Sequence, residues 1–237
     1  MTLLYVFPHP DDESFGPGPA IARQTREGHA VHVLTLTKGG ATKVRHELDL
    51  SVEEMGAVRE REVACAVRAL GAEGTVLDFP DGELTNADPR DLERVIERKI
   101  QAVRPDVVVT YACHGNSLHP DHIAAHAVTK RAFCQAKDDL AAKGPRRLAL
   151  FTLVRDELDH AADHLHGSPR ERIGAVVAFS DEDRERAEAA LGCYETYRSV
   201  VEAQRPLEAV REGVAFELYA EAHDDPLPDL TSDLLDS

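Results

Sequence analysis

Residues 3–16, LLYVFPHPDDESFG, place five apolar residues directly before a cluster of histidine, aspartate and glutamate. The apolar run at 3–7 predicts a buried strand, because it is short, continuous and followed by proline. The polar cluster then has two interpretations. Aspartates after a strand can cap the next helix, or they can supply half of a metal site. The second interpretation requires another polar cluster at the end of a neighbouring strand.

Short apolar runs alternate with amphipathic stretches from about residue 3 to residue 154. The runs predicted as strands are 3–7, 30–37, 75–79, 106–113 and 147–154. The stretches predicted as helices are 18–27, 52–70, 88–104 and 119–136. Strands that alternate with helices form parallel sheets covered on both faces. We therefore predict an α/β fold, a Rossmann-like three-layer sandwich with a mostly parallel central sheet.

The domain organisation follows from the same pattern. We expect a single domain over residues 1–220, whose part at 155–220 is less regular than the rest. Within that part, 175–179 is predicted as a strand, 180–204 as one helix and 212–222 as an extended segment. Residues 221–237 contain several acidic residues and no Lys or Arg, so we expect a flexible acidic tail.

Composition excludes several classes of partner. The chain has 237 residues and a net charge of -16, which disfavours nucleic acids and anionic membranes. It shows no signal peptide and no apolar stretch near the ~20 residues that span a bilayer. The four cysteines form no C-x-x-C pair, so we expect reduced thiols in a cytoplasmic protein.

A second polar cluster, HGNSLHPDH at 114–122, follows the predicted strand 106–113. In the common doubly wound order this strand lies beside strand 3–7, and ligands bind where the strand order reverses. Six side chains are therefore expected to converge across more than a hundred residues of sequence. They are His9, Asp11, Asp12, His119, Asp121 and His122.

Histidines and carboxylates together suit a divalent metal such as zinc. Three protein ligands leave a position for water, as in catalytic rather than structural sites. The doublet Asp11–Asp12 can serve two roles in such a site, because one carboxylate can bind the metal while the other acts as a general base. A further histidine beside the metal can stabilise a developing oxyanion.

The motifs PHPDDE and HPDH resemble those of the LmbE-like, or PIG-L-type, zinc-dependent de-N-acetylases. The stretches FPDGEL at 79–84 and REREV at 59–63 are also typical of that family, and the resemblance covers about residues 3–135. It implies that His9, Asp12 and His122 bind zinc. It further implies hydrolysis of the N-acetyl group of an N-acetylglucosamine-type conjugate, with release of acetate.

The resemblance also implies roles for the other polar side chains. Asp11 would be the general base, His119 would stabilise the oxyanion, and Asp121 would orient His119. Some members position the sugar with an arginine after the second strand, a role expected here for Arg45 or for Lys43.

Three alternatives stay open at this point. Two histidines and one aspartate also form the site of non-haem iron enzymes, and Fe²⁺ or another divalent metal can occupy a hydrolase site. A non-catalytic sugar-binding protein would use the same scaffold.

His160 and His164 form an i, i+4 pair that we interpret as solvated surface. The sequence does not decide the oligomeric state, and a homo-oligomer stays open as well.

Overall fold

The computed structural model describes residues 1–140, 143–158, 164–210 and 212–234. Its strands are β1 (Thr2–Phe7), β2 (Ala30–Thr37), β3 (Glu73–Phe79), β4 (Val107–Tyr111), β5 (Arg147–Thr152), β6 (Ala175–Val177) and β7 (Val214–Leu218). Its α-helices are α1 (Gly18–Arg26), α2 (Val52–Ala69), α3 (Pro89–Val103), α4 (Pro120–Leu140), α5 (Asp181–Gly192) and α6 (Arg198–Gln204).

The strands form one sheet in the order β3-β2-β1-β4-β5-β7-β6. The first five in this order pair in parallel, and β7 runs antiparallel to both of its neighbours. This confirms the predicted mostly parallel α/β sheet. Because β1 pairs with both β2 and β4, the strand order reverses beside β1, at the position where the polar clusters were expected to meet.

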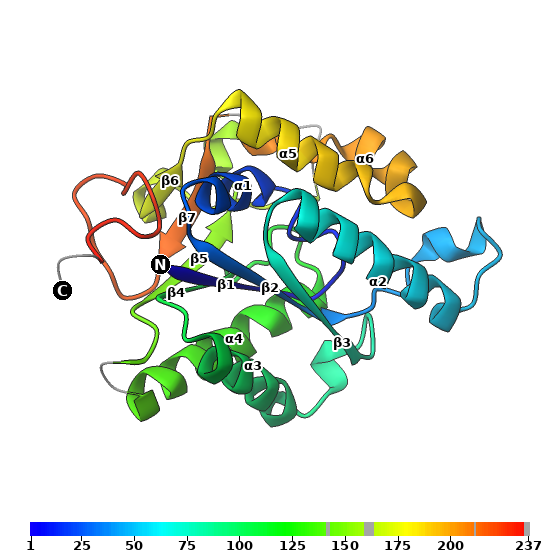
Figure 1. Ribbon diagram of the computed structural model, residues 1–237, viewed down its shortest axis with the longest axis horizontal. Coiled ribbons are helices and arrows are strands. Elements are labelled where there is room, and N and C mark those ends of the chain that lie inside the picture. Colours follow the sequence, from blue (N-terminus) through cyan, green and yellow to red (C-terminus); the bar gives the residue numbers. More distant parts are fainter. Residues whose placement is uncertain (141–142, 159–163, 211, 235–237) are drawn as a thin grey trace.

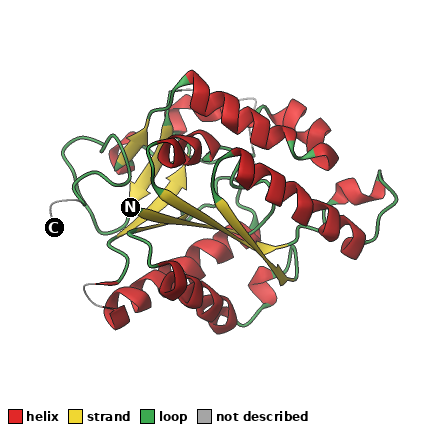
Figure 2. Cartoon of the chain, in the orientation of Figure 1, coloured by secondary structure: helices red, strands yellow, loops and turns green. Residues whose placement is uncertain are grey.

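Strand β1 explains why the fold has three layers (Figures 1 and 2). Its side chains alternate between two apolar layers: Leu3, Tyr5 and Phe7 lie in one core, and Leu4 and Val6 in the other. Helices α1, α2 and α5 cover the first face of the sheet, and α3 and α4 cover the second. A strand that is apolar on both faces is stable only when both faces are buried.

The stretch 180–204 was predicted as one helix, and the structure corrects this. It divides into α5 and α6, which are separated by a 3₁₀ turn at Glu195–Tyr197. Tyr194, directly before this turn, is buried and its hydroxyl donates to Glu13 over 2.6 Å. A tertiary contact, which no helical periodicity reveals, therefore holds the chain directly after α5.

The expectation of reduced cysteines is also wrong for one pair. Cys65 of α2 and Cys193 at the end of α5 form a disulfide across 128 residues of sequence. The two helices pack on the same face of the sheet, which brings the sulfurs together although neither cysteine belongs to a recognisable motif. Cys113 and Cys134 are free.

Loss of this disulfide is expected to lower the free energy of unfolding by about 2–4 kcal/mol, because the crosslink restricts a long loop of the unfolded chain. The measurement is urea denaturation of the wild type and of Cys65→Ser/Cys193→Ser, with Cys113→Ser as the matched control. Equal stability of all three proteins would contradict the prediction.

Residues 221–234 are not the flexible acidic tail that we expected. They pack along β5 and β6, and Leu227, Leu230 and Leu234 are buried. Arg147, only 2% exposed, holds the segment: its guanidinium pairs with Glu221 and donates to two carbonyl oxygens of the segment. The prediction failed because it considered the acidic residues of the segment and not its leucines, which bury apolar surface against the sheet.

The first turn of α5 contains a carboxylate whose ionisation stabilises the fold. Burial alone would raise the pKa of Asp183, but hydrogen bonds from Arg26 and from Ser180 lower it to about 2. An Asp pKa that is depressed in the folded state stabilises the protein above the unfolded pKa of about 3.8, and the contribution disappears as the pH falls towards 2.

We therefore expect Asp183→Asn to cost on the order of 1 kcal/mol of unfolding free energy at pH 7 and to cost much less near pH 2. Denaturation of the variant and the wild type at both pH values measures this difference. The control is Asp181→Asn, at an exposed position in the same turn. A cost for Asp183→Asn that does not change with pH would argue against an ionic role.

Candidate metal centre

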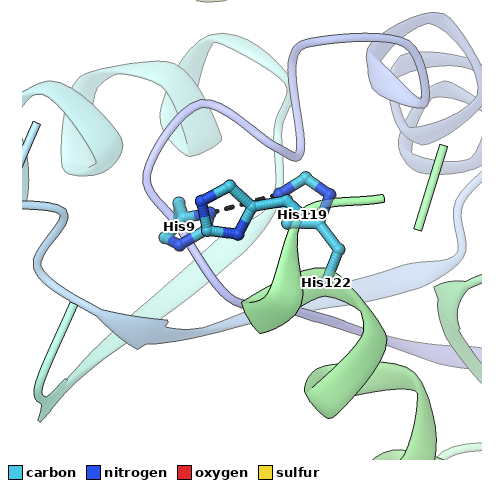
Figure 3. A group of neighbouring side chains, drawn as sticks. All are labelled: His9, His119 and His122. Carbon is cyan, nitrogen blue, oxygen red and sulfur yellow. Dashed lines mark hydrogen bonds between the residues drawn. The ribbon is translucent and has the colours of Figure 1, made fainter. Parts of the chain in front are cut away.

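The two polar clusters meet at the edge of the sheet where β1 and β4 end. His9, Asp11 and Asp12 lie in the turn after β1, whereas His119 and His122 flank the start of α4. Figure 3 shows His9, His119 and His122 facing one another, with a dashed line between His9 and His122. Parallel pairing of β1 with β4 brings these distant segments together.

Three residues present ligand atoms at spacings that suit a metal ion. Nδ1 of His9 lies 3.2 Å from Nε2 of His122 and 3.6 Å from Oδ2 of Asp12. Nε2 of His122 lies 3.4 Å from Oδ1 of Asp12. Ligand atoms about 2.0–2.1 Å from a tetrahedral zinc are separated from one another by roughly 3.3 Å. Each pair among His9, Asp12 and His122 is therefore spaced like two ligands of one divalent metal, with Asp12 facing each histidine through a different oxygen. Two other groups, His9 with His119 and His122, and His9 with Asp81 and Asp121, also bring candidate ligand atoms together.

Contacts around His122 and Asp12 fix their orientation. Nδ1 of His122 donates to the carbonyl oxygen of Gly115 over 2.9 Å, which leaves Nε2 with its lone pair for a metal. The ring of Tyr111 stacks on His122 with the centroids 4.3 Å apart. The Tyr111 hydroxyl donates to Oδ1 of Asp12 over 2.6 Å. One tyrosine at the end of β4 thus positions two of the three candidate ligands.

His9 is oriented by two carboxylates on its other side. Its Nε2 lies 3.2 Å from Asp121 and 3.3 Å from Asp81, so this nitrogen carries the hydrogen and Nδ1 is left for a metal. Asp121 also accepts hydrogen bonds from the backbone N–H groups of Gly82 and Leu84.

This arrangement differs from the role expected for Asp121. Its carboxylate contacts His9 and the loop after β3, whereas His119 receives only the backbone N–H of Asp121, at Nδ1 over 3.2 Å. Nδ1 of His119 is therefore an acceptor, and Nε2 of the neutral ring carries the hydrogen. Burial lowers the pKa of His119, and nearby His9 lowers it further. His119 thus offers a neutral N–H donor beside the candidate metal ligands.

Asp11 is held apart from the ligand set by an arginine of α2. Nη2 of Arg59 donates to the Asp11 carboxylate over 2.7 Å, and Arg59 is only 2% exposed. Burial raises the pKa of Asp11 to about 7, against the lowering effect of Arg59. The residue has a φ of +92°, a left-handed conformation that aspartate adopts more readily than most residues. A carboxylate with a pKa near neutrality suits a general base.

A cavity of about 1010 Å³ opens beside these residues. Lys43 and Ser117 line it, but Arg45 does not: the Arg45 guanidinium donates to the carbonyl oxygen of Leu50 instead. The structure therefore does not support Arg45 as a substrate-binding residue. His164 lies exposed at the cavity, whereas His160 is outside the described residues.

Four residues of the site had no role in the sequence interpretation: Arg59, Asp81, Tyr111 and Tyr197. Arg59 and Asp81 belong to the stretches REREV and FPDGEL, which resembled the family without indicating what those side chains contact. Tyr197 places its ring over the Arg59 guanidinium at 4.1 Å. Only the positions of β3, β4 and α2 around the two loops identify these partners.

Fold and site together define an α/β protein with a candidate metal centre of two histidines and one aspartate at the switch point of its sheet. The profile of the GlcNAc-PI de-N-acetylase (PIG-L) family matches residues 4–133, more than half of the chain. The protein belongs to this family.

Relatives of known name agree with this membership. A "1D-myo-inositol 2-acetamido-2-deoxy-alpha-D-glucopyranoside deacetylase" of Thermobifida fusca is 35% identical over 70% of this chain and 67% of its own. One of the same name from Kineococcus radiotolerans is 34% identical over 58% of this chain and 46% of its own. The chain thus spans about half the length of the first relatives it matches. A solved deacetylase of the teicoplanin biosynthesis pathway shares the fold, with a TM-score of 0.73, 19% identity and coverage of 95% of this chain and 100% of its own.

Proposed function

We propose that the protein is a metal-dependent hydrolase that removes the N-acetyl group from an N-acetylglucosamine-type conjugate. The observation that carries this proposal is the candidate ligand set His9, Asp12 and His122, with the His119 imidazole against His9 and with Asp11 in the same cavity lining. The names of the relatives support an amino-sugar amide as the substrate.

A divalent metal bound by these residues, zinc in our proposal, would act as a Lewis acid and lower the pKa of a bound water. The chain supplies the rest. The Asp11 carboxylate accepts the proton of the attacking water, and Arg59 holds that carboxylate in place. The N–H of His119 stabilises the oxyanion that forms when the amide carbonyl is attacked. The proton held by Asp11 then passes to the amide nitrogen as the C–N bond breaks, which releases acetate and the free amine.

The two rival functions are less well supported. A non-haem iron oxygenase would use the three ligands but would leave the Asp11–Arg59 pair without a task. A non-catalytic sugar-binding protein would need neither a general base nor an oriented N–H donor beside the metal ligands. An oxygen-consumption assay of the iron-loaded protein separates the first rival from the hydrolase.

The decisive experiment is an assay of acetate release from N-acetylglucosamine and its glycosides with the zinc-loaded protein. We expect turnover that a chelator abolishes and that added zinc restores, together with about one metal ion per chain by elemental analysis. Absence of acetate release from every such conjugate would refute the proposed function.

Location and assembly are part of the same proposal. No described helix combines the length and the apolar character needed to cross a membrane. The cytoplasmic location stays a prediction, and the Cys65–Cys193 disulfide counts against it because cytosolic thiols are usually kept reduced. Homo-oligomer formation also stays a prediction, which light scattering of the purified protein would test.

A further inference from the structure

The cavity at the candidate metal centre has apolar as well as polar walls. Its metal end is lined by the histidines and aspartates described above. Beside several polar side chains, the rest of the lining contains apolar side chains that are not fully buried, here called the apolar wall: Phe15, Leu158, Leu165, Val200, Ala203 and Ala209. The metal end and the apolar wall line the same continuous cavity, so one ligand can contact both.

The apolar wall comes mainly from a part of the chain beyond the family match at 4–133. Val200 and Ala203 lie on α6, and Ala209 lies in the 3₁₀ turn Pro206–Val210 that follows it. The chemistry of the metal end therefore belongs to the family domain, whereas the composition of the wall is a property of the C-terminal part of this chain.

Three charged side chains of the lining are already paired. Arg205 and Glu208 line the cavity and form an ion pair with each other. Glu157 also lines it and pairs with Arg170 over 2.6 Å. An ionic ligand would have to break one of these pairs to bind any of the three, whereas Lys43, which also lines the cavity, belongs to neither pair.

The volume of the cavity also bears on the ligand. About 1010 Å³ is at the upper end of the roughly 300–1,000 Å³ typical of small-molecule sites. An acetamido sugar alone at the metal end would leave the apolar wall open to water, although covering such a surface is favourable. We infer that the substrate is an N-acetylated amino sugar whose anomeric substituent is apolar, an alkyl or aryl group. This inference rests on the proposed function.

The test compares three glycosides of N-acetylglucosamine with the zinc-loaded protein: methyl, octyl and myo-inositol, each below the concentration at which the octyl glycoside forms micelles. Each methylene that reaches the wall should lower KM about fourfold. We expect kcat/KM for the octyl glycoside to exceed that for the methyl glycoside by on the order of 10- to 100-fold, chiefly through KM. The value of kcat/KM for the octyl glycoside should also exceed that for the polar inositol glycoside.

The outcomes distinguish this inference from the function on which it rests. Turnover of all three glycosides with equal efficiency, or with the inositol glycoside preferred, would overturn the apolar substituent and leave the deacetylase intact. Faster hydrolysis of N-octanoylglucosamine than of the octyl glycoside would place the apolar chain on the amide and also overturn the assignment. No turnover of any compound would refute both proposals.

Variants of the wall provide a second measurement. Leu165→Asn and Val200→Asn should each lower the octyl-to-methyl ratio of kcat/KM about tenfold, because a polar amide replaces the contact with the alkyl chain. The matched control is Leu48→Asn, at a position that is 44% exposed and outside the cavity lining. Thermal denaturation checks that each variant is folded. An unchanged ratio in folded variants of both wall residues would contradict the inference.

Discussion

Replacing Asp11 with asparagine is expected to lower kcat of the proposed deacetylase by about 10²–10⁴-fold, the usual contribution of a general base. The amide keeps the size of the side chain and can still accept a hydrogen bond from Arg59, but it cannot take a proton from water. Asparagine also tolerates the φ of +92° at this position, so the turn should keep its conformation.

Metal content separates this effect from damage to the site. Because Asp11 is not among the three ligands, the variant should bind as much zinc per chain as the wild type. Asp78→Asn, at a side chain that is 81% exposed, controls for the loss of one negative charge. Near-normal kcat in zinc-loaded Asp11→Asn would show that another group, such as Asp81, acts as the base.

Replacing Asp12 with asparagine is expected to abolish activity by a different route, because it removes a ligand. Asp12 is 4% exposed, and its two oxygens accept from the Tyr111 hydroxyl and the backbone N–H of His9. The amide preserves the shape and one of these contacts but loses the charge that favours a divalent cation. We expect zinc affinity to fall by more than about 100-fold, since even residues outside the ligand set contribute about 10–100-fold.

Tyr111→Phe provides a graded comparison. It leaves all three ligands and the ring stacked on His122, and it removes only the hydrogen bond to Asp12. Its zinc affinity should fall by about 10–100-fold. The readouts are metal per chain after dialysis and the rise in melting temperature on zinc addition, which measures binding to the folded state. If Asp12→Asn bound zinc as tightly as the wild type, Asp12 would not be a metal ligand.

The sequence correctly predicted the features of the fold that depend on the residue pattern of short segments. The double-sided apolar run of β1 and the alternation of strands with helices require a covered parallel sheet. The adjacency of β1 and β4 followed from the preferred topology of such sheets, and with it the meeting of PHPDDE and HPDH.

Predictions failed where long-range contacts override local pattern. Tyr194 is buried in the core between α5 and α6, and Arg147 holds an acidic segment that composition alone describes as flexible. The Cys65–Cys193 disulfide joins positions whose proximity depends on how two helices pack on the sheet. None of these contacts leaves a periodic or spacing signal in the chain.

The same division applies to the candidate site. The sequence by itself determined that His9, Asp12 and His122 stand in two short motifs that follow strands, and the family resemblance of these motifs predicts them as metal ligands. The tertiary structure decided what surrounds them: Arg59 against Asp11, Tyr111 across two candidate ligands, and Asp121 turned to His9 rather than to His119. The candidate ligands lie shortly after the strands β1 and β4, in a loop or at the start of α4, and are therefore visible in sequence. Their partners come from other helices and loops, and only the packing of those elements around the sheet brings them within hydrogen-bonding distance.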